Sequence, residues 1–252
     1  MPLLKTRGLV LRAYDYGDSS RIFRVYTRDA GAQSLLARGV KGSRSRLRGV
    51  LDLFNLVDVS FYRKAGRSLH VPREADLVES HAVLKRDLGR MLGFGAVVRL
   101  LQALALEEEA NPEMFDLLID TAAAFDRADL AAEAIEPLRH YASWQVLARK
   151  GYAPEVDCCV ACGSEAGGSP GFAVAEGGVV CGRCDARGRP LSRREYGALQ
   201  LFLHGDGGLA AAWRFDGGEG RRLDRIREEF AVYHAGLPPR FLAGPPYAGM
   251  LR

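Results

Sequence analysis

Four cysteines in the second half of the chain form two Cys-x2-Cys pairs, Cys159–Cys162 and Cys181–Cys184, separated by eighteen residues. Two intervening residues let one tight turn direct both sulfurs of a pair at a single ion. Gly163 and Gly182 give these turns conformational freedom. Four thiolates are a tetrahedral ligand set of structural Zn²⁺ sites. The spacing therefore predicts one structural Zn²⁺ ion, with no open coordination position for hydrolysis.

The cysteines also allow other interpretations. A redox-active Cys-x-x-Cys pair would lie at a strand–helix junction of a thioredoxin-like unit, and no such pattern surrounds these pairs. Plain reduced thiols are the remaining alternative. Cys158 is a fifth cysteine. We expect it to lie outside the ligand set, and a register that uses Cys158 with Cys162 is the second possibility.

A run of five cations without an acidic residue forms the second informative group: Arg38, Lys41, Arg44, Arg46 and Arg48. The run cannot bury an apolar face, so we expect a solvated loop. Like charges this close repel one another, and a phosphate backbone relieves the repulsion while releasing its counterions. We predict that these residues contact phosphates, with Arg12, Arg21 and Arg24 as neighbouring contacts. A solubilising loop without a partner is the alternative.

No catalytic constellation is found in the sequence. Residues 167–171 match Gly-x-Ser-x-Gly, but a hydrolase nucleophile elbow needs a strand–turn–helix context, and this copy lies between the cysteine pairs. Residues 39–43 lack the spacing of a Walker loop. No His-x-Glu motif accompanies the cysteines as in zinc deaminases. We therefore expect a protein that is not an enzyme.

The net charge of +4 is unevenly distributed. Residues 1–79 contain fifteen Lys and Arg against eight Asp and Glu, a net charge of +7, whereas residues 80–252 carry a net charge of −3. No apolar run approaches the roughly 18 residues of a membrane span, and the N-terminus lacks the apolar region of a signal peptide. We expect a cytoplasmic protein, where clustered cysteines favour metal binding over disulfides.

The first third of the chain reads as five short strands separated by glycine turns. The predicted strands cover residues 6–14, 21–26, 33–37, 51–62 and 68–78. Five strands in so short a segment indicate a small closed barrel, and the OB-fold is the five-stranded barrel that commonly binds single-stranded nucleic acid. Four aromatic residues are candidates for stacking on bases or, alternatively, for filling the core: Phe23, Tyr26, Phe61 and Tyr62.

The remainder of the chain has mostly helical spacing of apolar residues. Helices are predicted over residues 84–106, 114–125, 130–150, 192–203 and 220–235. Asn111 and Pro112 predict the start of the second helix, and Ser192 with Glu195 predicts a capping box. Residues 205–208 are glycine-rich, and we expect an irregular C-terminal tail.

Two parts of the chain resemble the RecO family of bacterial recombination mediators. The matching residues of the first part are Gly8–Arg12, Tyr16–Ser20, Gly31, Ala37–Lys41, Ser45–Leu47 and Leu53–Phe54. Those of the second part are Cys159, Cys162, Gly163, Phe172, Gly177, Gly178, Cys181 and Cys184. The resemblance is weak in the middle helices and the tail, and Cys158 departs from the plain four-cysteine pattern.

The resemblance implies a multidomain protein of α and β structure. We expect an OB-fold nucleic-acid-binding domain over residues 1–79 and a helical domain whose first part covers residues 80–156. An inserted four-cysteine zinc finger would occupy residues 157–190, and residues 191–252 would complete the helical domain and the tail.

The resemblance also implies a function. It implies binding to single- and double-stranded DNA, annealing of complementary strands, and loading of RecA onto SSB-coated DNA together with RecR. RecF would be an indirect partner, the protein would associate with the nucleoid, and no membrane would be involved. An RNA-binding OB protein and a zinc-dependent hydrolytic enzyme are the alternatives.

The two protein partners are assigned to different regions. RecR is expected on the basic barrel. The acidic tail of SSB needs an apolar pocket rimmed by positive charge, and residues 130–150 contain such a set: Arg139, Tyr141, Trp144, Leu147, Arg149 and Lys150. The alternative is that these aromatic residues belong to the core and the arginines are only solvated.

Overall fold

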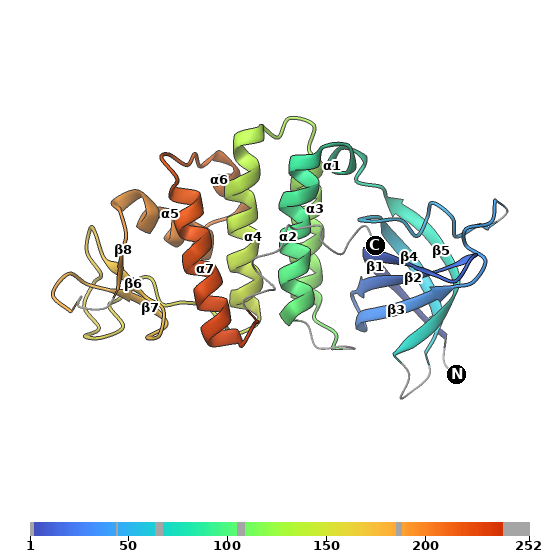
Figure 1. Cartoon of the computed structure of the whole chain (residues 1–252), viewed down its shortest axis with the longest axis horizontal. Helices are drawn as coiled ribbons and strands as arrows, with labels where there is room; N and C mark the ends of the chain where they lie inside the picture. The colour runs from blue at the N-terminus through green and yellow to red at the C-terminus, as the bar shows by residue number, and fades with distance from the viewer. Residues whose placement is uncertain (1–2, 44, 64–67, 105–108, 185–187, 239–252) are drawn as a thin grey trace. The chain divides into compact units, whose positions relative to one another are not determined.

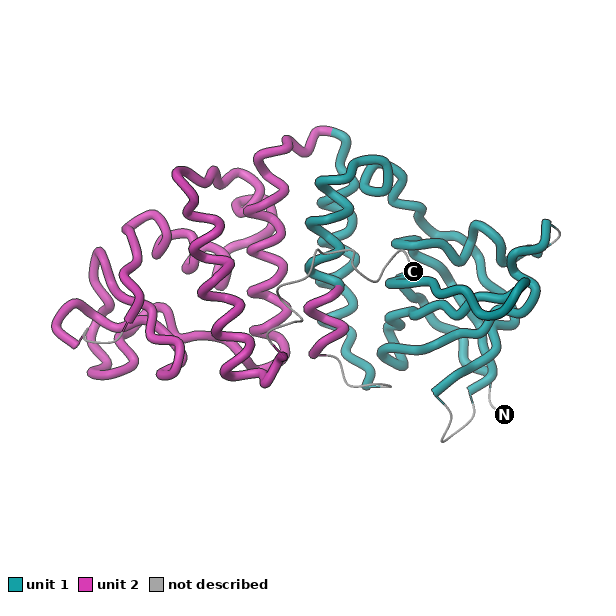
Figure 2. The backbone as a smooth tube through the Cα atoms, viewed as in Figure 1, with its two compact units in different colours: residues 1–98, 105–128, 245–252 teal, residues 99–104, 129–244 magenta. Residues whose placement is uncertain are grey.

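The computed structural model describes residues 3–43, 45–63, 68–104, 109–184 and 188–238. Figure 2 shows that the chain packs as two compact units. Unit 1 comprises residues 1–98, 105–128 and 245–252, and unit 2 comprises residues 99–104 and 129–244. Each unit therefore combines segments that are separated in the sequence.

Five strands of unit 1 form a closed barrel in the order β1-β2-β3-β5-β4 (Figure 1). Their bounds are Leu3–Tyr16 for β1, Ser20–Thr27 for β2, Gly31–Ala37 for β3, Leu56–Tyr62 for β4 and Leu69–Glu79 for β5. The pair β3–β5 is parallel and the other neighbours are antiparallel. The predicted five-stranded, OB-like barrel is confirmed.

Alternating side chains of the strands fill the barrel. Phe23 and Val25 of β2 point into an apolar cluster with Leu35 and Phe61, while Arg24 between them lies on the other face. Period-two alternation has this consequence because successive side chains of a strand point to opposite faces. The alternation of β2 therefore places Arg24 on the outside of the barrel, whereas Arg21 is exposed near the end of the strand, where it pairs with Asp15.

The strand β4 begins later than predicted, at Leu56 rather than residue 51. Leu51 instead packs into the barrel interior, and Phe54 adopts a left-handed backbone with φ of 61°. The Phe54 amide donates to the Val10 carbonyl at 2.8 Å, and its ring packs edge-on against Phe94 at 4.9 Å. Apolar residues of this stretch are thus buried although the backbone turns there. The spacing of apolar residues in the sequence does not distinguish such turns from a strand.

Three helices complete the described part of unit 1: α1 (Ala82–Arg86), the first part of α2 (Leu88–Leu104) and α3 (Pro112–Asp126). The prediction of one helix from residue 84 is wrong, because Asp87 is extended and its carboxylate accepts from the Arg90 amide at 2.8 Å. Asp87 therefore ends α1 and caps α2. The predicted end at residue 106 lies outside the described residues. Asn111 caps α3 as predicted, accepting from the Met114 amide at 2.9 Å.

The described part of unit 2 contains four further helices and a small sheet in the order β7-β6-β8. The helices are α4 (Ile135–Arg149), α5 (Arg193–His204), α6 (Gly207–Ala212) and α7 (Glu219–Ala235), with the 3-10 turn η1 (Ala132–Ala134) before α4. The strands are β6 (Gly171–Ala173), β7 (Gly178–Val180) and β8 (Arg189–Pro190). The capping box of Ser192 and Glu195 is confirmed. The helix α6 was not predicted, since its glycines indicate a loop, yet Asp206 caps it by accepting from the Leu209 amide.

Candidate nucleic-acid interface and metal centre

The basic run lies between β3 and β4 and is held by tight turns. Backbone amides of Gly42, Ser45 and Arg48 each donate to the carbonyl three residues earlier, at 3.1–3.2 Å. Val40 belongs to the apolar cluster inside the barrel, and Leu47 packs against it. The expectation that this run buries no apolar side chain is therefore wrong. These two side chains anchor the loop, so its cations project from a fixed backbone.

Three of the predicted phosphate-binding residues are exposed cations without an ion-pair partner among the described residues. Arg38, Arg46 and Arg48 are exposed, and no ion pair joins them to another residue in the described ranges. Arg44 lies outside the described residues. Exposed guanidinium groups keep both their charge and their five N–H donors available to a partner.

Two other predicted residues share one carboxylate. Arg21 and Lys41 contact Asp15 at 2.9 and 3.0 Å. Hydrogen bonds from Lys41 and then Arg21 hold the pKa of Asp15 below its ordinary value. The shared acid reduces the net charge of these three residues to +1. It also joins the basic loop to the end of the β1–β2 hairpin.

Arg12 and Arg24 face one another across the β1–β2 pair. The Arg24 Nη1 atom donates to Ser34 Oγ at 2.8 Å, and the Arg12 guanidinium lies over the Tyr14 ring, 4.3 Å from its centroid. The structure therefore places two of the three predicted neighbours of the basic run, Arg12 and Arg24, on one face of β1 and β2.

Of the four candidate aromatic platforms, three are buried. Phe23 and Phe61 belong to the apolar cluster of the barrel, and Tyr26 is 1% exposed. Burial, with a contribution from Glu109, raises the pKa of Tyr26 to about 12. Tyr62 on β4 is 39% exposed. The core-filling alternative therefore describes the first three residues.

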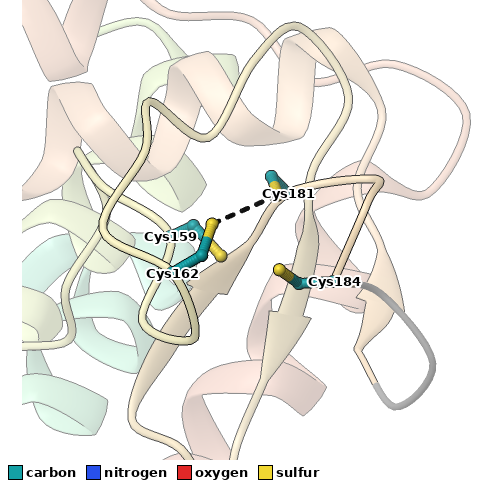
Figure 3. A group of neighbouring side chains, drawn as sticks. All are labelled: Cys159, Cys162, Cys181 and Cys184. Atoms are coloured by element: carbon teal, nitrogen blue, oxygen red, sulfur yellow. Dashed lines mark hydrogen bonds between the residues drawn. The ribbon is translucent and has the colours of Figure 1, made fainter.

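The predicted metal ligands come together in unit 2, as Figure 3 shows. Cys159 and Cys162 lie in a turn before β6, and Cys181 and Cys184 follow β7 directly. Their four Sγ atoms all lie within 4.8 Å of one another, and those of Cys162 and Cys181 are 3.8 Å apart. Two backbone contacts hold this arrangement: the Val160 amide donates to the Val179 carbonyl at 2.9 Å, and the Cys184 amide donates to the Cys181 carbonyl at 2.9 Å.

The donor set fits a tetrahedral metal ion. Thiolates bound at about 2.3 Å around Zn²⁺ stand roughly 3.8 Å from one another, and the Cys162–Cys181 distance matches this edge. The distance is far from the roughly 2.05 Å of a disulfide. The four-cysteine cluster can therefore hold a metal ion.

The protonation of the thiols also fits a cation site. Backbone N–H groups of Arg183 and Cys184 lower the pKa of Cys181 to about 6. Hydrogen bonds to Ser164 lower the pKa of Cys162, whereas the sulfurs of Cys162 and Cys181 raise the pKa of Cys184 to about 12. Neighbouring sulfurs thus compete for protons, and a bound cation replaces those protons when thiolates become ligands.

Residues around the cluster include two that the sequence did not indicate. The Ser164 Oγ atom lies 3.0 Å from the Cys162 sulfur, and Arg183 Nη2 donates to Ser164 Oγ at 3.4 Å. Both residues lie one or two positions from a ligand, and that proximity was the available signal. Cys158 is exposed, its amide donates to Glu155, and it is not part of the cluster.

A second group in unit 2, Glu136, His140 and Asp224, has the residue types of a metal site. Arg139 binds both Asp224 carboxylate oxygens at 2.7 Å, and Arg227 contacts the same residue at 2.8 Å. Burial raises the pKa of Asp224, but Arg227 and Arg139 outweigh this effect and hold the pKa well below its ordinary value. The carboxylate is already neutralised by two guanidinium groups, so this group is an ion-pair network.

The same network tests the predicted SSB pocket on α4. Trp144 and Leu147 are fully buried, and Arg139 pairs with Asp224. The prediction that these residues form a pocket for an acidic tail is therefore wrong. Trp144 and Leu147 belong to the core of unit 2, as the alternative interpretation stated, whereas Tyr141 is half-buried and Arg149 is exposed. Arg139 is ion-paired rather than only solvated.

Family models match both halves of the chain. The model described as Recombination protein O N terminal matches residues 1–81, and the model described as Recombination protein O C terminal matches residues 85–242. The chain belongs to the RecO family. The first match covers the barrel, and the second covers the described helices of unit 2 with the four-cysteine cluster.

Similar proteins are named DNA repair protein RecO. The one from Anaeromyxobacter dehalogenans (strain 2CP-C) is 31% identical over 240 residues, which cover 94% of this RecO-family chain and 93% of the relative. The one from Halalkalibacterium halodurans is 32% identical, with 80% of this chain and 78% of the relative covered. The one from Symbiobacterium thermophilum is 31% identical, with 92% of each covered. In the described ranges of this RecO-family chain, no helix has the length and apolar character to span a membrane.

Proposed function

We propose that this RecO-family protein binds single- and double-stranded DNA and anneals complementary strands without catalysis. Together with RecR, it would help to load RecA onto SSB-coated DNA during repair, with RecF as an indirect partner. The family supports the role in repair. The binding and annealing activities are supported by the physical character of the barrel surface.

The observation that carries the proposal is the anchored basic loop. Arg38, Arg46 and Arg48 are exposed and project from turns that Val40 and Leu47 fix to the barrel. Guanidinium groups bind phosphate oxygens through paired N–H donors, and such contacts supply affinity without reading the sequence. A mediator that must accept any damaged sequence needs contacts of this kind.

Annealing follows from the same contacts. Two strands repel one another through their phosphates, and cations bound to one strand reduce that repulsion while releasing counterions. The binding free energy is then sufficient to bring strands together, so the reaction would need no nucleotide. We propose that DNA and RecR both bind within residues 1–79.

We further propose that the four-cysteine cluster holds one structural Zn²⁺ ion through Cys159, Cys162, Cys181 and Cys184. Four thiolates fill the tetrahedral coordination of Zn²⁺, so the ion would stabilise the turns around β6 and β7 and would leave no position for a catalytic water. This donor set opposes the alternative of a zinc-dependent hydrolase.

Annealing of complementary oligonucleotides, followed by fluorescence without nucleotide, tests the proposed function. Reversal of two loop charges, Arg46→Glu with Arg48→Glu, is expected to lower DNA affinity by about tenfold per lost contact. It should also reduce the slope of log K against log salt by up to about 0.9 per contact. Annealing should fall in parallel for all sequences.

A matched control makes the same charge change elsewhere. Arg221 and Arg225 are exposed on α7 of unit 2, and their reversal to Glu should leave DNA affinity unchanged. Equal losses in both variants would refute the loop as the binding site. Competition by RNA of the same length distinguishes the RNA-binding alternative: tighter binding of RNA than of DNA would support that alternative.

The metal proposal has a separate test. Cys159→Ser removes a buried member of the cluster, and we expect loss of bound zinc by elemental analysis together with a lower melting temperature. Cys158→Ser is the matched control, because the exposed Cys158 lies outside the cluster. It should keep both the metal and the stability. Full zinc content in Cys159→Ser would overturn the ligand assignment.

A further inference from the structure

The outer surface of β1, β2 and β3 presents aligned rows of side chains. The backbone register places Arg12 opposite Arg24, and Arg24 opposite Ser34. In the next row of the same face, Tyr14 lies opposite Ile22, and in the row after that Tyr16 lies opposite Ser20.

The residues between these rows point to the other face. Ala13, Phe23 and Leu35 pack inside the barrel. The rows of arginine and tyrosine are therefore on the outside.

The two arginines of this face lie in a row that contains no acidic residue, as the strand register shows. Like charges directly opposite one another on a sheet are destabilising, and Arg12 stands directly opposite Arg24. The Nε atom of Arg12 is buried and has no hydrogen-bond partner among the described residues. An anion bound beside Arg12 would relieve part of this repulsion.

The tyrosines of the face are available for contact. Tyr16 is 54% exposed, and Tyr14 is partly exposed with the Arg12 guanidinium over its ring at 4.3 Å. An aromatic ring exposed next to cations is the arrangement on which unpaired bases stack while their phosphates are neutralised. Bases within a duplex are already stacked and paired, so they cannot use such a ring without being extruded.

The basic loop continues this face. The Gly39 amide donates to Ser20 Oγ at 3.3 Å, and the Lys41 amide donates to the Ser19 carbonyl at 3.0 Å. Lys41 Nζ also donates to the Gly17 carbonyl at 3.3 Å. These contacts hold the loop beside the hairpin end that carries Tyr16. A nucleic-acid backbone bound along the loop would therefore reach the tyrosines.

We propose that Tyr14 and Tyr16 form a stacking site for unpaired nucleobases, with Arg12 and Arg24 binding the adjoining phosphate. This proposal rests on the proposed DNA-binding function and adds the residues that distinguish single strands from duplex. The loop binds phosphates of either form, whereas the tyrosine site accepts only a base that is free to stack.

Alanine substitution of both tyrosines tests the proposal in the full-length protein. Binding of oligothymidylate and of a blunt duplex of equal length is measured by fluorescence anisotropy at one salt concentration. Stacking contributes about 1–3 kcal/mol per base, so the double variant should lose roughly 5- to 150-fold in affinity for oligothymidylate for each base that stacks in the wild-type site. Affinity for the duplex should change less than about twofold, since no stacked base is lost.

Two further variants separate stacking from loss of structure. Tyr14→Phe with Tyr16→Phe keeps both rings and should retain the affinity for oligothymidylate. Tyr233→Ala removes a tyrosine that is 62% exposed on α7, and it should leave both affinities unchanged. Equal losses for single strand and duplex, or failure of the phenylalanine variant to retain binding, would overturn the stacking site.

The outcome is distinguishable from failure of the proposed function. If the alanine variant binds oligothymidylate normally while reversal of Arg46 and Arg48 abolishes binding, the stacking site is wrong and the DNA-binding loop stands. If neither change affects binding, both proposals are wrong.

Discussion

Two groups of arginine side chains, one in each unit, have opposite surroundings. On the loop of unit 1, Arg38, Arg46 and Arg48 are exposed and have no ion-pair partner within the described residues. In unit 2, the side chains of Arg139 and Arg227 are only 16% and 9% exposed, and both contact Asp224. The same residue type therefore stabilises the fold in one unit and remains available to a partner in the other.

The difference has a physical cause. Removing a guanidinium group from water costs several kcal/mol unless a carboxylate and hydrogen bonds replace its hydration. The hydration of Arg139 is replaced by the carboxylate of Asp224, and that of the buried Arg90 is replaced in part by the carbonyls of Phe125 and Arg127. An arginine in water meets no such cost, and its charge is not used within the fold. Burial, rather than the number of positive charges, therefore distinguishes the arginines that stabilise the fold from those that are available to a partner.

The largest effect is expected from breaking the buried network. Asp224→Asn leaves Arg139 and Arg227 without their shared charge, and removal of one partner of a buried pair costs about 3–5 kcal/mol. We expect this loss in the free energy of unfolding measured with urea. DNA affinity of the folded variant should not change, because the network holds the core of unit 2.

Asp216→Asn is the matched control for this change. Asp216 contacts Arg194 at 3.3 Å and is 75% exposed, so its loss should alter the free energy of unfolding by less than about 1 kcal/mol. Equal effects of the two substitutions would show that burial does not distinguish these pairs.

A second experiment titrates the histidine within the network. His140 is fully buried beside Arg139, Asp224 and Arg227. Burial, followed by the charge of Arg139, holds its pKa well below the ordinary value. The unfolded chain binds this proton near pH 6.5 and the folded chain does not. The contribution of neutral His140 to stability is therefore complete above about pH 6.5 and is lost as the pH falls below it.

His140→Phe keeps the ring that stacks on Phe202 at 5.7 Å and removes the titration. In the wild-type protein, the free energy of unfolding should fall by up to about 1.4 kcal/mol for each pH unit below about pH 6.5 because of His140. In the variant, the slope of the free energy of unfolding against pH should be smaller by that amount. Urea unfolding at several pH values measures this slope. An unchanged slope in His140→Phe would contradict the assignment.

The smallest effect concerns the acid that lies within the basic surface. Asp15→Asn frees Arg21 and Lys41 from their shared carboxylate, so we expect a gain in DNA affinity of about two- to fivefold and a steeper salt dependence. Asp58→Asn makes the same charge change at the Arg7 pair between β1 and β4 and should have less effect. A loss of affinity in Asp15→Asn would show that this carboxylate positions the cations rather than masks them.

Local features of the fold could be predicted from short stretches of sequence. The Asn111 cap and the Ser192–Glu195 capping box form as expected, because each involves residues within one helical turn. All five strands of the barrel were found, since alternation within a strand reflects the two faces of a sheet. The break between α1 and α2 at Asp87 was missed, although its carboxylate follows the same local rule.

Features that depend on distant residues were not predictable in this way. The interpretation of Phe23, Tyr26 and Phe61 as core or platform remained open until the barrel placed them inside. Tyr14 and Tyr16 were missed as platforms because their exposure depends on which face of β1 turns outward. The available signal was that Arg12, Tyr14 and Tyr16 are spaced two residues apart, because residues i, i+2 and i+4 of a strand share a face.

The sequence by itself determined where the four-cysteine cluster and the basic loop lie in the chain. Its cysteine spacing indicated the four sulfurs that gather around β6 and β7, since the turn within each pair is a local structure. Its uneven charge indicated the basic segment. Only the tertiary structure decided which cations remain available. Arg21 meets Asp15 across β1 and β2, and Arg139 meets Asp224 across 85 residues of sequence. Charge pairing depends on distances of a few ångströms, and the folded chain alone sets those distances.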